Sequence, residues 1–162
     1  MKEIKLTRGR VALVDDEDYE YLNQWKWKVT IGSNTEYAIR VKSIYVDGKR
    51  VRKLVIMHRL ILNAPSNMQV DHVNHNGLDN RRCNIRLATM SQNNSNRKAY
   101  GVSKFLGVYF YKPRQVWRAR LKINGKLIEL GHFKIEEDAA KSYDVAAKKY
   151  HGEFANLNFP NG

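Results

Sequence analysis

Residues 70–86, VDHVNHNGLDNRRCNIR, gather side chains that could do acid–base or metal chemistry. The stretch contains two histidines and two aspartates, together with several asparagines and one cysteine. Histidine exchanges protons near neutral pH, and carboxylate and carboxamide oxygens suit hard cations such as Mg²⁺ or Mn²⁺. The composition leaves three interpretations open: a metal site, an acid–base site, or a polar turn rich in Asn and Gly.

The order of residues favours a metal site. Asp71 and His72 are adjacent, so in a strand their side chains point to opposite sides. Asp71 can then hold a cation that binds a phosphate group, while His72 approaches that phosphate from another direction. The segment NHNGLDN (74–80) predicts a loop, after which Asn84 returns, and Asn93 can add a second oxygen ligand. Water and phosphate would fill the remaining positions around Mg²⁺ or Mn²⁺.

Short strands and short helices must position these residues. Asp47-Gly48 is a tight-turn signal between two strands, and Pro65 stops a short helical segment. The predicted N-terminal elements are strand 11–14, helix 15–25, strands 35–46 and 50–57, helical turns 58–64 and a polar helix 89–98.

The C-terminal part predicts a three-stranded sheet and one helix. Strands are expected at 105–111, 116–123 and 126–133, followed by a helix over 135–152. Asn124-Gly125 is a strong hairpin signal between the second and third strands. Alternation in the second strand, VWRARLKI, places Trp117, Ala119, Leu121 and Ile123 on an apolar face and Arg118, Arg120 and Lys122 on an open basic face. The predicted packed face of the helix comprises Ala139, Ala140, Tyr143, Ala146, Ala147 and Tyr150.

Charge indicates a polyanionic partner. The 162 residues carry a formal net charge of +13, and residues 104–134 hold eight basic residues against one acid, Glu129. Such an excess attracts nucleic acid. No apolar run is long enough to span a membrane, and the N-terminus does not resemble a signal peptide. Cys83 is the single cysteine, which excludes an intrachain disulfide, and we expect it to pack as a small residue. The expected location of the protein is the cytoplasm of a bacterium or of a virus-infected cell.

Residues 103–160 resemble the plant APETALA/ethylene-response-factor DNA-binding domain. The resemblance rests on LGVYFY, WRARL, LGHF, EEDAAKSYDVAA and NLNFP, in that order. It implies a three-stranded sheet lying in the DNA major groove with a helix packed behind it. Leu106, Tyr109, Tyr111 and Arg120 depart from the plant pattern, so the plant recognition sequence does not carry over.

Residues 56–95, with HRLIL followed by VDHVNHNGLDNRRCNIRLATMSQN, resemble HNH nucleases of the homing-endonuclease kind. The resemblance implies a ββα-metal core around one divalent cation. By motif position, Asp71 and Asn93 are metal ligands and His72 is the general base that takes a proton from the attacking water. Asn84 would hydrogen-bond across the loop and hold the histidine. His58 and His75 are candidates for support of the active site, and packing or a surface-loop role is the alternative for each.

Together these features predict an α+β protein: an HNH endonuclease domain (1–98, core about 56–96), a linker (99–104) and an APETALA/ERF-type DNA-binding domain (105–162). The predicted function is a site-directed, homing-type DNA endonuclease that uses Mg²⁺ or Mn²⁺ and acts as a monomer on double-stranded DNA, by nicking or double-strand cutting. A non-catalytic, sequence-specific DNA-binding regulator is the alternative; a non-specific toxin nuclease is disfavoured by the sheet module. The predicted DNA contacts are Arg81, Arg82, Arg86, Arg97, Lys98, Tyr109, Tyr111, Arg114, Arg118, Arg120 and Lys122.

Overall fold

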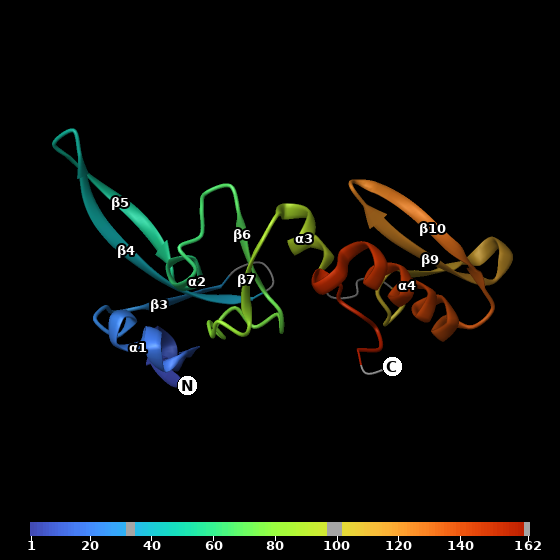
Figure 1. Cartoon of the computed structure of the whole chain (residues 1–162), viewed down its shortest axis with the longest axis horizontal. Helices are drawn as coiled ribbons and strands as arrows, with labels where there is room; N and C mark the ends of the chain where they lie inside the picture. The colour runs from blue at the N-terminus through green and yellow to red at the C-terminus, as the bar shows by residue number, and fades with distance from the viewer. Residues whose placement is uncertain (32–34, 97–101, 161–162) are drawn as a thin grey trace. The chain divides into compact units, whose positions relative to one another are not determined.

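The computed structural model describes residues 1–31, 35–96 and 102–160, and the chain forms two compact units, Met1–Thr89 and Met90–Gly162 (Figure 1). The predicted linker and the predicted DNA contacts Arg97 and Lys98 fall wholly or partly outside the described residues. The polar helix that the sequence assigns to the nuclease domain, α3 (Met90–Ser95), belongs to the second unit. The predicted boundaries of the nuclease domain (1–98) and of the DNA-binding domain (105–162) therefore stay a prediction.

The first unit begins with an antiparallel pair, β1 (Lys2–Lys5) and β2 (Val11–Val14), joined through the 3-10 turn η1 (Thr7–Gly9). Helix α1 (Asp16–Leu22) follows, with three acids in its first turn, where they meet the partial positive charge of the helix end. The buried core side chains include Ile4, Val14, Leu22, Trp27 and Met57.

A three-stranded sheet, in the order β3-β4-β5, extends this unit. Its strands are β3 (Lys28–Ile31), β4 (Glu36–Val46) and β5 (Lys49–Ile56). Asp47 and Gly48 both have positive φ, which is the geometry of the predicted tight hairpin turn. Beyond Arg40 the β4–β5 hairpin is largely exposed and carries five cations: Lys42, Lys49, Arg50, Arg52 and Lys53.

The site-bearing segment follows as α2 (Met57–Ile61), β6 (Gln69–His72) and β7 (Ile85–Ala88). β6 and β7 form a two-stranded antiparallel sheet in which Asp71 pairs with Arg86 and His72 with Ile85. The two strands and the loop of the expected ββα core are therefore present. The complete ββα-metal layout stays a prediction, because α3 lies in the second unit.

The second unit contains the predicted sheet and helix. β8 (Val108–Tyr111), β9 (Val116–Ile123) and β10 (Lys126–Phe133) form an antiparallel sheet in the order β10-β9-β8. The 3-10 turn η2 (Lys112–Arg114) joins β8 to β9, and Asn124 and Gly125 have the positive φ of a tight turn. Helix α4 (Glu136–His151) is followed by η3 (Gly152–Phe154).

The apolar face of β9 packs against α4 as the alternation predicts. Ala119 and Leu121 are buried in the core with Ala140, Tyr143 and Ala147. The prediction for Tyr150 was wrong: it is 50% exposed, because the buried face of the helix ends at Ala147, about one turn earlier.

A buried carboxylate fastens the C-terminal tail of this unit. Asp144 of α4 accepts hydrogen bonds from the backbone N–H of Asn158 (2.9 Å) and of Phe159 (2.8 Å). The Asn158 side chain in turn binds the backbone N–H and carbonyl of Leu106, just before β8. The segment NLNFP is therefore part of the folded unit.

No helix in the described ranges is both long and apolar enough to cross a membrane.

Candidate functional site

Three of the predicted site residues lie together at one end of the β6–β7 pair. Asp71 and His72 are the last two residues of β6, and Asn84 immediately precedes β7. All three are buried, at 3%, 7% and 5% exposure respectively. Buried polar side chains need compensating partners, so their contacts indicate what each can do.

Asp71 is held by the arginine opposite it on β7. The Nε and Nη2 atoms of Arg86 lie 2.9 and 2.8 Å from Oδ2 of Asp71. This pair compensates a buried negative charge. A divalent cation offers the same carboxylate a stronger positive partner, so Asp71 has the chemistry and the charge of a hard-cation ligand.

His72 lies in an aromatic cluster with Tyr37 of β4 and His58 of α2. The ring centroids of His58 and His72 are 5.0 Å apart, and that of Tyr37 is 5.3 Å from His58 and 6.0 Å from His72. Burial lowers the pKa of His58 to about 3 and also lowers the pKa of His72, while Asn80, Asp71 and Asp79 oppose the shift at His72. Both imidazoles are therefore neutral at neutral pH, and a neutral imidazole can accept a proton.

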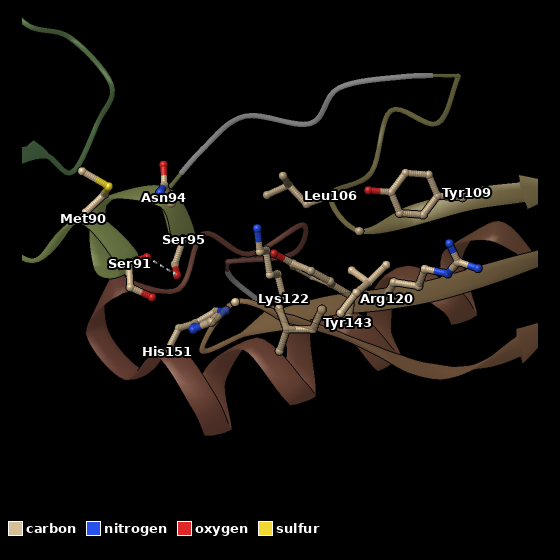
Figure 2. Close-up of a pocket in the computed structure, with 14 residues that line it drawn as sticks. Met90, Ser91, Asn94, Ser95, Leu106, Tyr109, Arg120, Lys122, Tyr143 and His151 are labelled. Carbon is tan, nitrogen blue, oxygen red and sulfur yellow. Dashed lines mark hydrogen bonds between the residues drawn. The ribbon is translucent and has the colours of Figure 1, made fainter.

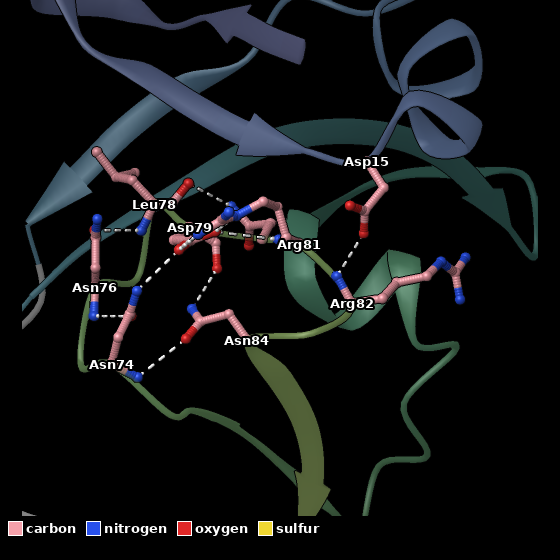
Figure 3. Close-up of polar contacts among 9 residues, drawn as sticks. Asp15, Asn74, Asn76, Leu78, Asp79, Arg81, Arg82 and Asn84 are labelled. Atoms are coloured by element: carbon pink, nitrogen blue, oxygen red, sulfur yellow. Dashed lines mark hydrogen bonds and ion pairs between the residues drawn. The ribbon is translucent and has the colours of Figure 1, made fainter. Parts of the chain in front are cut away.

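Asn84 ties the two ends of the loop together (Figure 3). Its Oδ1 accepts from the backbone N–H of Asn74 (3.0 Å), and its Nδ2 donates to the backbone carbonyl of Asp79 (2.8 Å). Asn84 thus hydrogen-bonds across the loop that follows His72. Both of these hydrogen bonds go to the loop backbone, so through them Asn84 can orient the His72 imidazole only by way of the loop.

Asp79, which the sequence analysis did not assign, is the centre of this loop. It is 2% exposed and accepts from Nδ2 of Asn74 (2.8 Å) and from Nε and Nη2 of Arg81 (2.7 and 2.6 Å). The neighbouring backbone is fastened to β2: Leu13 N–H donates to Leu78 O (2.9 Å), and Asn80 N–H donates to Leu13 O (2.8 Å). The loop is therefore held both by the side-chain contacts of Asp79 and by backbone hydrogen bonds to β2.

Replacing Asp79 with alanine is expected to lower the free energy of unfolding by about 2–3 kcal/mol, because it removes a buried acceptor and leaves its donors without it. The hydrogen bond from Arg81 is the main reason that the pKa of Asp79 is lowered. A carboxyl with a depressed folded pKa stabilises above its unfolded value, near 4, and this contribution disappears as pH falls through the folded value. Urea unfolding followed by Trp fluorescence at pH 7 and at pH 3 measures it.

In that experiment the difference between wild type and Asp79→Ala should shrink at pH 3. Glu3→Ala is the control, because Glu3 is exposed on β1 and forms no ion pair with another described residue. An equal difference at both pH values would show that the charge of Asp79 does not contribute.

The three arginines of the motif have carboxylate partners within the unit. Arg81 is paired with Asp79, and Arg86 with Asp71. Arg82 forms ion pairs with Glu17 and Asp18 of α1, and its backbone N–H donates to Asp15 (2.7 Å). These pairs fasten the loop, and phosphate contacts by the same arginines stay a prediction.

Tyr37 has a second contact that sequence reasoning missed. A Cβ added to Gly77 would lie 2.8 Å from the Tyr37 ring and 2.3 Å from the Glu36 carbonyl. The loop therefore presses directly on β4, and only glycine fits there. Nothing in the pattern around residue 37 signals this role, because the contact joins segments about 40 residues apart in the chain.

Three further residues singled out from the sequence are His75, Asn93 and Cys83. His75 lies within the loop with φ 61°, and its backbone N–H donates to the carbonyl of His72 (2.9 Å). Asn93 lies on α3 in the second unit, so a cation shared with Asp71 stays a prediction. Cys83 is exposed and does not pack as expected, because it lies in the turn before β7.

The expected donor set is one carboxylate and one carboxamide, Asp71 and Asn93. Within the described ranges no group of three His, Cys, Asp or Glu side chains could hold a metal. A two-oxygen set fits Mg²⁺, which keeps several waters and completes its shell with substrate phosphate. It does not fit a structural zinc site, which needs four protein ligands.

The sheet of the second unit presents the predicted basic face, but the face is not purely basic. Arg118, Arg120 and Lys122 share it with Tyr109 and Tyr111, following the strand register. Glu129 of β10, opposite Arg120, is ion-paired with both Arg118 and Arg120. Arg114, in η2, is exposed.

A pocket of about 720 Å³ in the second unit adjoins this face (Figure 2). Ser91 and Asn94 of α3 line it together with Tyr109, Arg120 and Lys122 of the sheet. None of its described lining residues is a carboxylate. Arg120 and Lys122 make the lining suitable for an anionic ligand.

Asp71 and His72 are buried at the end of β6, and Asn84 closes the loop that follows them. Residues 63–95 match the family model described as HNH endonuclease, and the match includes Asp71, His72, Asn84 and Asn93. The chain is 29% identical over 152 residues to an uncharacterized HNH endonuclease of Acanthamoeba polyphaga mimivirus, covering 93% of this chain and 76% of the viral protein. Residues 63–95 are therefore similar to HNH endonucleases, and the viral relative extends the similarity over most of the chain.

About 60 residues of the chain are similar to parts of plant transcription factors. The chain is 38% identical over 60 residues to the AP2-like ethylene-responsive transcription factor TOE2 of Arabidopsis thaliana, and 41% identical over 61 residues to CRL5 of Oryza sativa subsp. japonica, also named AP2-like. These matches cover 37% and 36% of this chain but only 12% and 10% of the plant proteins. They support a DNA-binding module, and the activities of the whole plant proteins do not transfer with them.

Proposed function

We propose that this protein is a site-directed, homing-type DNA endonuclease that hydrolyses a phosphodiester bond with one divalent cation. The observation that carries the proposal is the placement of Asp71 and His72, both buried, as consecutive residues at the end of β6, with Asn84 closing the loop that follows them. HNH endonuclease similarity over the same residues supports the chemistry.

His72 would act as the general base. Its imidazole is neutral at neutral pH because burial lowers its pKa, so it is ready to take a proton from the attacking water. The cluster with Tyr37 and His58 restricts the rotation of the ring. A positioned base of this kind contributes roughly 10²- to 10⁴-fold to a rate.

Asp71 and Asn93 would hold Mg²⁺ or Mn²⁺, which stabilises the negative charge that develops on the phosphate and the leaving oxygen. Binding a cation at Asp71 would release Arg86 from its present ion pair. A released guanidinium beside the site can bind a phosphate oxygen of the DNA backbone. One site in each chain supports nicking by a monomer, and two such events give a double-strand break.

Double-stranded DNA is the proposed substrate because cations accumulate on both units. The β4–β5 hairpin exposes Lys42, Arg52 and Lys53, and none of the three is ion-paired with a carboxylate in the described part of the chain. The sheet face of the second unit would supply most of the site choice, since a strand face with arginines fits a major groove. Joining the two units raises the effective concentration of each on DNA.

The test is nicking of supercoiled plasmid by the full chain, with Mg²⁺ and with EDTA. Wild type is expected to convert the plasmid only with Mg²⁺. Asp71→Ala should cleave at least about 100-fold more slowly than wild type, because it removes a ligand of an essential cation. Residues that only support such a ligand already cost roughly 10- to 100-fold when they are replaced. Binding to the same plasmid in EDTA should remain, because the two units keep their other cations. Mg²⁺-independent binding with no cleavage by wild type would instead identify a DNA-binding regulator.

A further inference from the structure

Glu129 occupies an unexpected place on the basic sheet face of the second unit. It is the one acid between residues 104 and 134, and the register of β9 and β10 places it directly opposite Arg120. A surface that only neutralised phosphates would gain nothing from a carboxylate, which repels the DNA backbone. The contacts of Glu129 therefore indicate a different use.

Both oxygens of the Glu129 carboxylate accept hydrogen bonds from Arg118. Nε of Arg118 lies 2.7 Å from Oε1 of Glu129, and Nη2 bonds to Oε2. Arg120 Nη2 is 3.6 Å from Oε2, and His132 Nε2 is 2.9 Å from Oε1. The hydrogen bond with Arg118 lowers the pKa of Glu129, so the carboxylate is ionised at neutral pH.

An aromatic ring supports the same guanidinium. The Cζ atom of Arg118 lies 4.9 Å from the ring centroid of Tyr111, on the neighbouring strand β8. Stacking of this kind and a two-point ion pair together hold the plane of the guanidinium. The Arg118 side chain still has 21% of its surface exposed.

The two-point ion pair with Glu129 determines which N–H groups of Arg118 remain available to bind DNA. Glu129 uses the edge formed by Nε and Nη2, which leaves the N–H groups of Nη1 and the second N–H of Nη2 as an edge with two parallel donors. Two parallel donors match O6 and N7 of guanine in the major groove.

We infer that Arg118 reads a guanine base and that Glu129 is the positioning residue that orients it. The inference rests on the proposed function, in that this sheet face must contact DNA. It assigns to Arg118 a base contact rather than a phosphate contact, and to Glu129 a role in selectivity. Lys122 lies on the same face and forms no ion pair with a carboxylate among the described residues, so it is the matched phosphate-binding cation.

The experiment measures binding of the full chain to a randomised DNA duplex library in EDTA, so that cleavage does not contribute. The variants are Arg118→Lys, Glu129→Gln and Lys122→Gln, all on the exposed sheet face outside the core. Wild type should select guanine at one position by roughly 5- to 150-fold over other bases. Arg118→Lys should lose that selection. Glu129→Gln should weaken it at the same position while affinity for random DNA rises, because a negative charge is removed.

Lys122→Gln should reduce affinity equally for all sequences and lower the dependence of log affinity on log salt by about one. A guanine preference unchanged in Glu129→Gln, or a uniform loss in Arg118→Lys, would overturn the inference. If none of the three variants changes DNA binding, the sheet face does not contact DNA, and that part of the proposed function fails with it. Loss of thermal stability in Glu129→Gln without a change in base preference would also count against the positioning role.

Discussion

Replacing His72 with alanine is expected to reduce Mg²⁺-dependent DNA cleavage by at least 100-fold while leaving DNA binding within about threefold of wild type. The reason is that a positioned general base contributes roughly 10²- to 10⁴-fold to the rate. His72 is 7% exposed at the end of β6, so its removal does not touch the exposed cations of the β4–β5 hairpin or the second unit. Single-turnover cleavage with enzyme in excess measures the rate, and titration in EDTA measures binding.

His151→Ala is the matched control for this prediction. It removes a histidine from the end of α4, where none of the proposed catalytic groups lies, and should cleave at the wild-type rate. If His72→Ala cleaves as fast as wild type, the assignment of the general base is wrong. If His72→Ala also loses binding, the residue supports the fold of the unit and its chemical role is unproven.

Replacing Gly107 with alanine is expected to destabilise the second unit by about 3 kcal/mol or more, through overpacking and backbone strain. A Cβ at this position would lie 2.1 Å from the Tyr143 ring and 2.6 Å from the backbone carbonyl of Arg120, and φ is +69°. Tyr143 is buried in the α4 core and cannot move aside without opening it. Calorimetry of the full chain should show loss or a large downward shift of one transition.

Gly125→Ala separates the two causes. Gly125 also has positive φ (+82°), but nothing lies within 4 Å of an added Cβ. It should therefore cost only the backbone strain, about 1 kcal/mol. Equal effects of the two substitutions would show that the contact with Tyr143 is not the reason that glycine is needed at position 107. DNA site selection should be lost together with the folded second unit in Gly107→Ala and kept in Gly125→Ala.

Local patterns predicted the elements well where one signal dominated. VWRARLKI forms β9 over Val116–Ile123, and KLIELGHF forms β10 over Lys126–Phe133, as their alternation and the intervening Asn-Gly turn predict. Tyr150 follows the same helical spacing as its buried neighbours but is exposed, because spacing does not show where the sheet beneath a helix ends.

Partners of charged side chains could not be predicted, because they join distant segments. Arg82 meets Asp18 across 64 residues of chain, and the apparently open Arg118 meets Glu129 on the next strand. A charge count predicts attraction to DNA, but it does not show which cations are already neutralised within the fold. The same limit explains why Tyr37 was missed as a neighbour of His72.

The sequence by itself determined the sheet and helix of the second unit and the split of β9 into an apolar and a basic face, whereas β1 and β3 of the first unit were not predicted. The successful predictions follow from residue type and from periods of two and of three to four residues, which act locally. The roles of Asp71, His72 and Asn84 follow instead from the resemblance to HNH nucleases and stay a prediction. Only the tertiary structure decided that Asp79 anchors the loop, that Tyr37 and His58 enclose His72, and that Glu129 grips Arg118. Such contacts depend on how strands register and pack, and no local pattern encodes that pairing.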